Sequence, residues 1–156
     1  MKHPPNDEHI DSQMVKMEVN LDDIPGEWLG YVMDLLLESG ANDVYYTPIF
    51  MKKNRPAVLL QLLCSQELVP KMKKILFAET TTLGLRYYPL TVHRLERSFS
   101  KVLTPWGEVT IKKGIYGDES MQQAPEYEDC RKIAIQNNIP LKKVYEEVWR
   151  SLGEEK

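Results

Sequence analysis

The chain has 156 residues and a formal net charge of −3, so it is long enough for one domain or two small ones. A chain of this length hides roughly 70% of its unfolded surface and needs neither a disulfide nor a metal to fold. Its two cysteines lie far apart, which predicts the reduced thiols of a cytoplasmic protein. No stretch is long enough to span a membrane, and the polar start is expected not to be a signal peptide.

Charge is distributed unevenly along the chain. Residues 1–50 carry two Lys or Arg against ten Asp or Glu, whereas residues 51–113 carry twelve against four. Residues 114–156 carry six against nine. The basic middle predicts an anionic partner, although solvated faces that segregate by charge would give the same counts.

The first regular element is expected at residues 14–21, where polar and apolar side chains alternate as in a strand with one polar face. A helix should follow, because Pro25 suits its first turn and Gly40 its C-terminal cap. Apolar residues recur at helical spacing between them. Residues 44–51 predict a second strand, in which Pro48 favours a sheet edge.

The same order of elements then repeats. Residues 57–64 are nearly all apolar, which is typical of a central strand covered on at least one face. A helix capped by Ser65 should follow, and residues 83–92 alternate like another strand. Two strand–helix–strand units predict an α+β fold of the ferredoxin-like type, a four-stranded antiparallel sheet with both helices on one face.

A smaller lobe is expected after this sheet. A hairpin is predicted at residues 101–113, with Pro105 and Gly107 at positions that a β-turn favours. A loose polar segment at residues 114–124 and two helices should follow. The predicted organisation is a disordered tail at residues 1–13, a ferredoxin-like domain at residues 14–99, a hairpin-plus-two-helix lobe at residues 100–156, and helices within it at residues 126–137 and 140–152.

The strongest candidate site is the turn Lys52-Lys53-Asn54-Arg55 between the two halves. It holds three cations and an amide with no acid, whereas ordinary turns favour Asn-Gly or Pro-Asp-Gly. Arg binds polyanions as a planar fork and Lys as a point charge, so the turn predicts a triphosphate site. A solvated loop that blunts a sheet edge is the alternative.

Two further segments are candidates. Residues 80–82 are three threonines followed by the cation Arg86, although threonines also favour the start of a strand for structural reasons alone. Asp22 and Asp23 end the first strand, and paired carboxylates suit Mg²⁺ or Mn²⁺ beside phosphates. Because Asp23 is expected to cap the next helix, Asp22 is the predicted metal ligand.

The remaining segments favour structural roles. Acids at residues 125–130 suit the first turn of a helix, and a metal site there is the weaker alternative. No nucleophile–base pair is visible, so the catalytic residues are unknown. The last two helices resemble a helix-turn-helix with Lys142 and Lys143 in the second helix, but Glu146 and Glu147 follow, and an acidic face disfavours duplex binding.

Five groups of residues occur in order along the chain: NLDD, GYVMDLLLESGANDVYYTPIFMKKNRPA, FAETTTLGLR, ERSF with TPWGEV, and PEYEDCRKIA. In this combination the chain resembles the C-terminal part of the LarC family from about Val15 to Leu152. LarC proteins insert nickel into the nickel-pincer cofactor, pyridinium-3,5-bisthiocarboxylic acid mononucleotide.

The resemblance implies a nickel insertase of the lyase class that uses CTP with Mg or Mn. Family members cleave CTP to CMP and pyrophosphate by way of a cytidylylated thiocarboxylate and put Ni(II) into the mononucleotide. The C-terminal part is expected to bind CTP, to form homo-oligomers in the cytoplasm, and to bind neither membrane nor nucleic acid. Within the family strings, the implied metal ligand is Asp22 and the implied nucleotide-binding residues are Lys52, Lys53, Asn54, Arg55, Thr80, Thr81, Thr82 and Arg86.

Complete family members also carry a larger N-terminal half with a histidine-rich region that looks like a nickel collector. That half is absent from this sequence, and it is the expected partner for nickel insertion. Two alternatives stay open: a regulatory or assembly module that holds CTP without turning it over, and a DNA-binding protein that uses the last two helices.

Overall fold

Alternating side chains build the first strand, β1 (Glu8–Leu21), in the computed structural model, which describes residues 8–154. Residues 8–13, expected in a disordered tail, belong to this strand, and residues 1–7 of that tail lie outside the described residues. The predicted apolar face of β1 is confirmed, because these side chains are buried: Val15, Met17, Val19 and Leu21.

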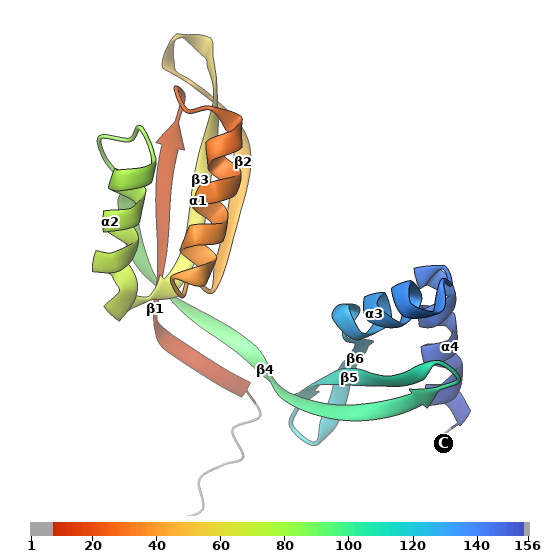
Figure 1. The fold of residues 1–156 in the computed structure, drawn as a ribbon. Coiled ribbons are helices and arrows are strands. Elements are labelled where there is room, and N and C mark those ends of the chain that lie inside the picture. The colour runs from red at the N-terminus through yellow and green to blue at the C-terminus, as the bar shows by residue number, and fades with distance from the viewer. Residues whose placement is uncertain (1–7, 155–156) are drawn as a thin grey trace, which may run out of the picture. The chain divides into compact units, whose positions relative to one another are not determined.

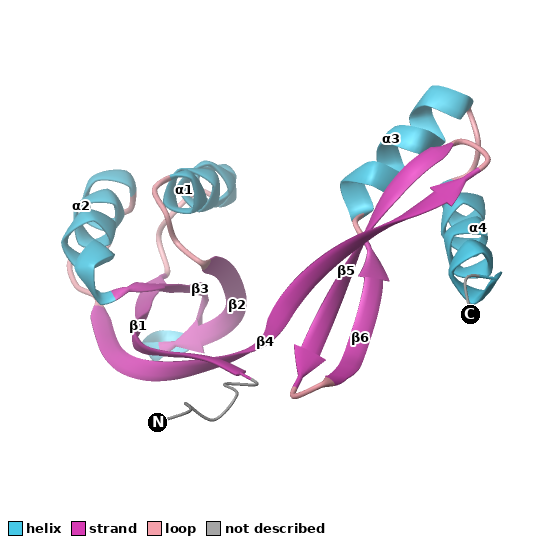
Figure 2. Cartoon of the chain, turned by 90° about the horizontal axis from the view of Figure 1, so that it is seen from below, coloured by secondary structure: helices cyan, strands magenta, loops and turns pink. Residues whose placement is uncertain are grey.

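Two helices, α1 (Gly26–Glu38) and α2 (Val69–Glu79), lie side by side on one face of the sheet (Figure 2). Each helix buries one apolar stripe and leaves its other side in solvent, as the helical spacing predicted. Together with β1 and two further strands they enclose one core, whose helical members are Val32, Leu36, Val69, Met72 and Leu76.

The two further strands are β2 (Asp43–Met51) and β3 (Arg55–Ser65), joined by the short 3-10 helix η1 (Lys52–Asn54). A second 3-10 helix, η2 (Gln66–Leu68), leads from β3 into α2. β3 pairs antiparallel with both β1 and β2, so the predicted central strand is confirmed. β2 stands at the edge of the sheet, where Pro48 is tolerated.

The sheet has six strands rather than the four expected, in the order β2-β3-β1-β4-β5-β6 (Figure 1). The difference arises in β4 (Arg86–Thr104), which we expected to end near residue 92. Its extended backbone continues to Thr104, and its second part pairs with β5 (Gly107–Tyr116). The predicted hairpin turn is confirmed, because Thr104 pairs with Gly107 across two loop residues.

One strand was missed. The segment expected to be loose at residues 114–124 contains the end of β5 and most of β6 (Glu119–Pro125), which pair as a hairpin. Every side chain of β6 except Pro125 is exposed, so no apolar alternation marks it in the sequence. The Gly117-Asp118 turn, with Gly117 at φ 65°, is the local signal that would have indicated this hairpin.

The chain divides into two units, Ile10–Val92 and a second one that contains His93–Lys156. The second unit has its own core, in which α3 (Tyr127–Asn137) and α4 (Leu141–Glu154) pack against β4 and β5. The buried members of the second core are Val102, Val109, Ile111, Cys130, Ile133, Val144 and Val148.

No helix of the described residues is both long enough and apolar enough to cross a membrane.

Candidate functional site

Three connections meet at one end of the first unit: β1 to α1 with Asp22 and Asp23, η1, and α2 to β4 with residues 80–82 (Figure 1). Since Leu21 pairs with Val58, the end of β1 lies beside the start of the antiparallel strand β3. The structure thus gathers the basic turn, the threonines and the paired carboxylates that the sequence marked as candidates.

Arg55 and Asp22 form an ion pair at this end, with Nη1 3.2 Å from Oδ2. The Arg55 side chain is 54% exposed and the Asp22 side chain 23%. Ion pairs this open to solvent contribute only about 0–1 kcal/mol. Breaking this ion pair therefore costs the protein little stability. An anionic ligand can then bind Arg55, and a cation can bind Asp22.

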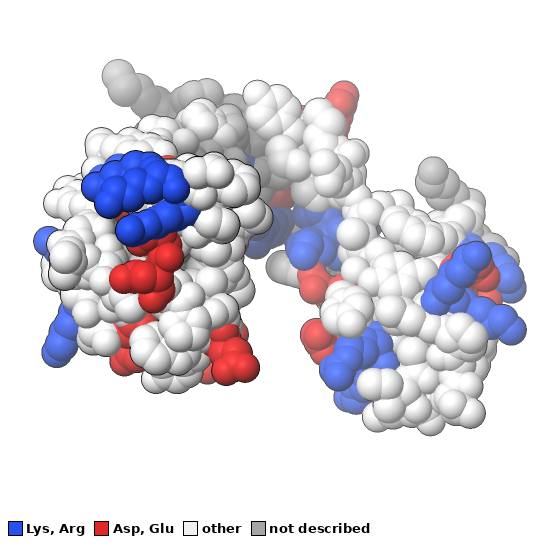
Figure 3. Space-filling view, turned by 90° about the horizontal axis from the view of Figure 1, so that it is seen from above, with Lys and Arg blue, Asp and Glu red and all other residues white. Residues whose placement is uncertain are grey.

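The turn η1 closes the β2–β3 hairpin through left-handed backbone. Lys53 has φ 61° and Asn54 has φ 55°. Asn tolerates this region, whereas a lysine there costs about 1–3 kcal/mol, a strain that clusters at ligand sites. Lys52 and Lys53 are exposed, and neither has an ion-pair partner among residues 8–154. A view of this end from above shows a patch of cations beside carboxylates (Figure 3).

Two of the three threonines serve the local backbone. The Thr80 hydroxyl donates to the Leu76 carbonyl at 2.6 Å and so closes the last turn of α2. The Thr82 hydroxyl donates to the Gly84 carbonyl at 2.6 Å, and the Gly84 N–H donates back to that hydroxyl at 3.2 Å. These contacts favour the structural alternative for Thr80 and Thr82.

Thr81 is different, because its hydroxyl donates across the chain to Asp23 Oδ1 at 2.5 Å. The expectation that Asp23 caps α1 is wrong. Pro25 occupies the N-cap position, and no side chain caps the helix there. Asp23 instead joins the β1–α1 connection to the threonine segment, so Asp22 and Asp23 together link the basic turn to Thr81.

Arg86 belongs to a polar network on the open face of the sheet. Its Nε donates to Glu18 Oε2 at 2.8 Å and its Nη1 donates to Asn20 Oδ1 at 2.9 Å. The Tyr88 hydroxyl and the Gln61 amide each donate to Glu18 Oε1 at 3.2 Å. Sequence reasoning missed Glu18 as the centre of this network, although its place on the polar face of β1 was the available signal.

The pKa of Glu18 lies below its ordinary value of 4.5. Partial burial opposes the charge, but the hydrogen bonds from Gln61, Arg86 and Tyr88 and the charge of Arg86 outweigh it. A carboxyl whose pKa is lowered by folding stabilises the protein above its unfolded-state pKa. That stabilisation is lost as the pH falls through the folded-state value.

Replacing Glu18 with Gln should therefore destabilise the protein most at neutral pH, with a difference from the natural chain that shrinks below about pH 4.5. Thermal unfolding of both proteins between pH 7 and pH 3 measures this. The control Glu67→Gln changes an exposed carboxylate and should shift stability by less than about 0.5 kcal/mol throughout. A difference that grows on acidification would contradict the assignment.

An aromatic hollow of about 390 Å³ lies between α1 and α2 beside the threonines. Trp28 is 51% exposed and Tyr31 59%, so neither ring belongs to the core. Half-exposed aromatic rings offer flat apolar faces on which a planar ring can stack. The hollow is lined by Glu27, Trp28, Tyr31, Ala78, Glu79 and Thr80.

Within residues 8–154 there is no group of three or more His, Cys, Asp or Glu side chains arranged to hold a metal ion. Asp22 by itself fits Mg²⁺, which is commonly held through one or two carboxylates together with substrate phosphates. The acids that begin α3 have the structural role that the sequence favoured. Glu126 pairs with Lys112 at 2.9 Å, and Asp129 accepts the Thr110 N–H at 2.8 Å.

Three cations on α3 and α4, Arg131, Lys142 and Arg150, pair with acids of their own helices. Arg131 lies 3.3 Å from Glu128, and Arg150 lies 3.0 Å from Glu147. A helix that reads duplex DNA needs such cations for phosphates. Ion pairs this exposed contribute only about 0–1 kcal/mol, so they do not decide between a structural and a DNA-binding role for these helices.

The family model described as "Nickel insertion protein" matches residues 4–145 of the chain. The chain is 45% identical over 145 residues to the pyridinium-3,5-bisthiocarboxylic acid mononucleotide nickel insertion protein of Acetivibrio thermocellus. It is 41% identical over 140 residues to the protein of the same name from Thermotoga petrophila. These alignments cover 93% and 90% of this chain but 35% of each relative, so the chain spans about a third of their length.

Among solved structures, the chain is similar to the C-terminal domain of a cyclometallase involved in the synthesis of the NPN cofactor of lactate racemase, in its apo form. The TM-score is 0.86 at 40% identity, over 94% of this chain and 99% of that one. A protein from Methanopyrus kandleri shares the fold, with a TM-score of 0.67 at 23% identity over 90% of this chain and 87% of that one. These matches confirm the resemblance to the C-terminal part of LarC proteins: the chain belongs to the nickel insertion protein family.

Proposed function

We propose that this chain is the CTP-binding part of a nickel insertase that acts on pyridinium-3,5-bisthiocarboxylic acid mononucleotide. The family and the names of its relatives support the nickel reaction. The observation that carries the CTP assignment is the placement of the basic turn against Asp22, with Asp23 bonded to Thr81. Since the chain spans about a third of its relatives, the N-terminal half is the proposed partner that completes insertion.

In this proposal the basic turn neutralises the negative charge of the triphosphate. Lys52, Lys53 and Arg55 bind the triphosphate, and Arg55 exchanges Asp22 for a phosphate oxygen. Asp22, released from that ion pair, would be the residue that holds Mg²⁺ or Mn²⁺. Such a bound ion would neutralise charge on the phosphate oxygens. The cations then stabilise the negative charge that builds up on departing pyrophosphate when CTP is cleaved to CMP.

The nucleoside half of CTP is proposed to lie toward the aromatic hollow. A continuous path of contacts runs from Arg55 through Asp22 and Asp23 to Thr81, whose neighbour Thr80 lines the hollow. Trp28 can stack on a base there. The proposed polar contacts to the sugar and base come from Asn54 and Thr81. Thr80, Thr82 and Arg86 were expected to contribute as well, but their hydrogen-bonding groups have partners within the chain.

The same proposal includes a ferredoxin-like arrangement, a cytoplasmic location and a homo-oligomer. The order of elements from β1 to β4, and the strand order β2-β3-β1-β4 within the sheet, support the first of these. This arrangement brings the β1–α1, β2–β3 and α2–β4 connections to one end of the unit, which is what a site assembled from three connections requires.

A nucleotide-binding module without turnover is the second candidate. The sequence shows no nucleophile–base pair, which such a module explains directly. In the insertase, the group that attacks the α-phosphorus would come from the cofactor precursor, so that observation fits both functions. Turnover therefore has to be measured directly.

Isothermal titration of the chain with CTP and Mg²⁺ is expected to show saturable binding that is stronger than binding of ATP. Chromatography of the same mixture with the mononucleotide substrate and the N-terminal half should then show CMP. Binding without CMP formation in the complete mixture would favour the module. If neither nucleotide binds, both candidates are wrong.

The substitution Asp22→Asn tests the contribution of the metal ion to CTP binding separately from that of the cationic side chains. Without a divalent ion, CTP should bind this variant at least as well as the natural chain, because Arg55 no longer has an anionic partner. With Mg²⁺ or Mn²⁺, the variant should lose most of the gain that the ion gives the natural chain. Titrations with and without the ion measure the difference, and an unchanged gain would exclude Asp22 as a ligand.

A further inference from the structure

Two apolar side chains flank the basic turn and the threonines, and both are largely exposed to solvent. Phe50 is 74% exposed and Leu83 is 100% exposed, the two highest values among the large apolar residues of Ile10–Val92. Single apolar residues on a surface are ordinary, but these two lie at the end of the unit that carries the candidate site. Uncharged surface borders the cation patch at this end (Figure 3). We call Phe50 and Leu83 the apolar rim.

The backbone holds both residues of the apolar rim in place. Leu83 lies inside a tight turn, in which the Thr82 hydroxyl donates to the Gly84 carbonyl at 2.6 Å and accepts the Gly84 N–H at 3.2 Å. Phe50 pairs with Pro56 in the β2–β3 hairpin, directly beside the basic turn. Side chains on an ordered backbone lose less conformational freedom when a partner covers them, and this favours binding.

Phe50 extends to the side of the sheet on which the helices lie. It shares a face of β2 with Val44 and Tyr46, because alternate residues of a strand point the same way. Val44 is buried, and the Tyr46 hydroxyl donates to the Leu29 carbonyl of α1, so α1 covers this face there. The cover ends before Phe50, whose ring is exposed. Phe50 therefore lies on the same side of the sheet as the aromatic hollow between α1 and α2.

The proposed reaction requires a second component at this end of the unit. The group that attacks the α-phosphorus of CTP would come from the cofactor precursor, and the chain shows no nucleophile–base pair of its own. Whatever holds the precursor must therefore contact the surface around the basic turn. Water must also be kept out of that contact, because it would compete for the α-phosphorus.

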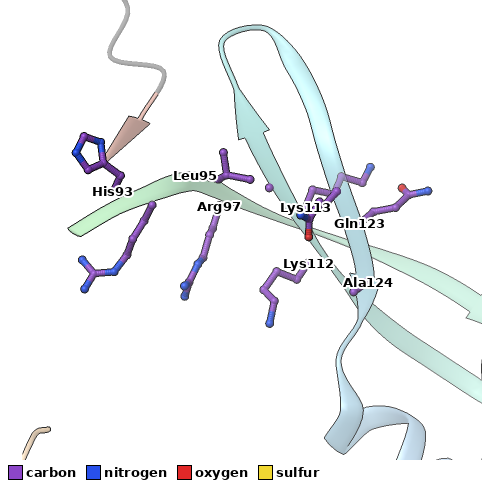
Figure 4. A pocket seen from close by; sticks show the side chains of 10 residues that line it. His93, Leu95, Arg97, Lys112, Lys113, Gln123 and Ala124 are labelled. Atoms are coloured by element: carbon purple, nitrogen blue, oxygen red, sulfur yellow. The ribbon is translucent and has the colours of Figure 1, made fainter. Parts of the chain in front are cut away.

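Cations in the second unit do not converge in the same way. A hollow of about 340 Å³ on β4, β5 and β6 has Arg97 and Lys112 on one side of the sheet and Lys113 on the other (Figure 4). Successive residues of a strand point to opposite faces, so these cations cannot share one small ligand. Lys112 is also paired with Glu126 at 2.9 Å. The end of the first unit is therefore the better place for a reacting group to be delivered.

We propose that the apolar rim is the docking surface for the part of the longer relatives' chain that lies outside the match, an assignment that rests on the proposed function. The matched part is only 35% of each relative, so most of each relative's chain is available for this role. An apolar patch of that part packs on Phe50 and Leu83 and holds the precursor over the triphosphate.

The positions of the two side chains suit such a contact. Phe50 is on β2 and Leu83 directly precedes β4, and these strands are the first and fourth in the sheet order. The basic turn and Asp22 lie between them in that order. Apolar contacts that surround a polar centre exclude water from it, as they do around the hot spots of protein interfaces.

Hydroxyl-radical footprinting tests the docking directly. It compares the chain alone with a long protein, the Acetivibrio thermocellus relative in which this chain replaces the matched part, both with CTP and Mg²⁺. Oxidation of Phe50 and Leu83 should fall at least about fivefold in the long protein, because the docked part excludes water. Phe99 and Leu103, 62% and 72% exposed in the second unit, should react equally in both, and buried Leu36 should stay protected if each protein is folded.

Unchanged oxidation of the apolar rim in the folded long protein would overturn the proposal. Protection of Phe99 and Leu103 in place of Phe50 and Leu83 would overturn it as well, because the docking surface would then belong to the second unit.

The double variant Phe50→Ser/Leu83→Ser should slow CMP formation by the long protein at least about 30-fold, because the apolar contact that stabilises docking is lost. CTP affinity of the chain alone should stay within about twofold. Phe99→Ser/Leu103→Ser exchanges the same two residue types in the second unit and is the matched control, which should change neither quantity. An undiminished rate of CMP formation in the Phe50/Leu83 variant would contradict the proposal.

Further outcomes separate this inference from its rivals and from the proposed function. If the Phe50/Leu83 variant of the chain alone binds CTP more weakly, the apolar rim belongs to the nucleotide site. If it sediments as a smaller species, the apolar rim joins copies of this chain. Either result overturns the inference. Protection of the apolar rim in a long protein that binds no CTP would contradict only the CTP assignment, whereas CTP binding without protection would contradict only the docking surface.

Discussion

Arg55→Glu is expected to weaken CTP binding by at least about 100-fold, which corresponds to about 2.7 kcal/mol. The change removes one charge-assisted contact to the triphosphate, typically about 1.5–3 kcal/mol. It also places a second carboxylate against Asp22, which lies 3.2 Å from Arg55 in the ion pair. Isothermal titration with CTP and Mg²⁺ measures the loss.

Arg131→Glu is the matched control for that experiment. Its side chain is 54% exposed, as is that of Arg55, and it pairs with a carboxylate at 3.3 Å. The reversal of charge should therefore alter solubility and net charge in the same way but leave CTP affinity within about twofold. Arg55→Lys keeps the charge without the planar fork and should give an intermediate loss of about tenfold. Full affinity in Arg55→Glu would show that the triphosphate binds elsewhere.

Leu36→Ala should cause the largest loss of stability among single substitutions in α1, about 2–5 kcal/mol. Leu36 is fully buried between α1 and the sheet, at 0% exposure. Its removal leaves a cavity among well-packed neighbours that cannot collapse without moving the helix. Denaturant titration followed by circular dichroism should show a lower midpoint with a similar slope.

Leu37→Ala is a control one position away on the same helix. Leu37 is 43% exposed, so the same chemical change removes far less buried surface. Its helix propensity effect favours alanine slightly, and the expected loss is below about 1 kcal/mol. Equal losses at the two positions would mean that α1 does not pack against the sheet by the stripe that contains Leu36.

The sequence by itself determined most of the helices and strands of this protein. The spacing of apolar side chains shows which residues must be buried, and that spacing differs between helices and strands. Val15, Met17 and Val19 alternate along β1, and Val32 and Leu36 recur on α1. This strand and this helix could therefore be predicted before the structure was known. The strand β6 was not predicted, because almost all of its side chains are exposed to solvent and give no apolar pattern in the sequence. The length of β4 was not predicted either, because a local pattern of side chains does not show which other strand will pair with it.

For the candidate site, the sequence supplied the residue types and only the tertiary structure supplied their partners. Three cations and no acid in the β2–β3 turn marked it as a candidate anion site by composition alone. That Asp22 pairs with Arg55, that Asp23 accepts from Thr81 instead of capping α1, and that Arg86 is held by Glu18 depend on contacts between residues far apart in the chain. Charge and hydrogen-bonding capacity are properties of a residue, whereas pairing depends on the distances that strand order and register set.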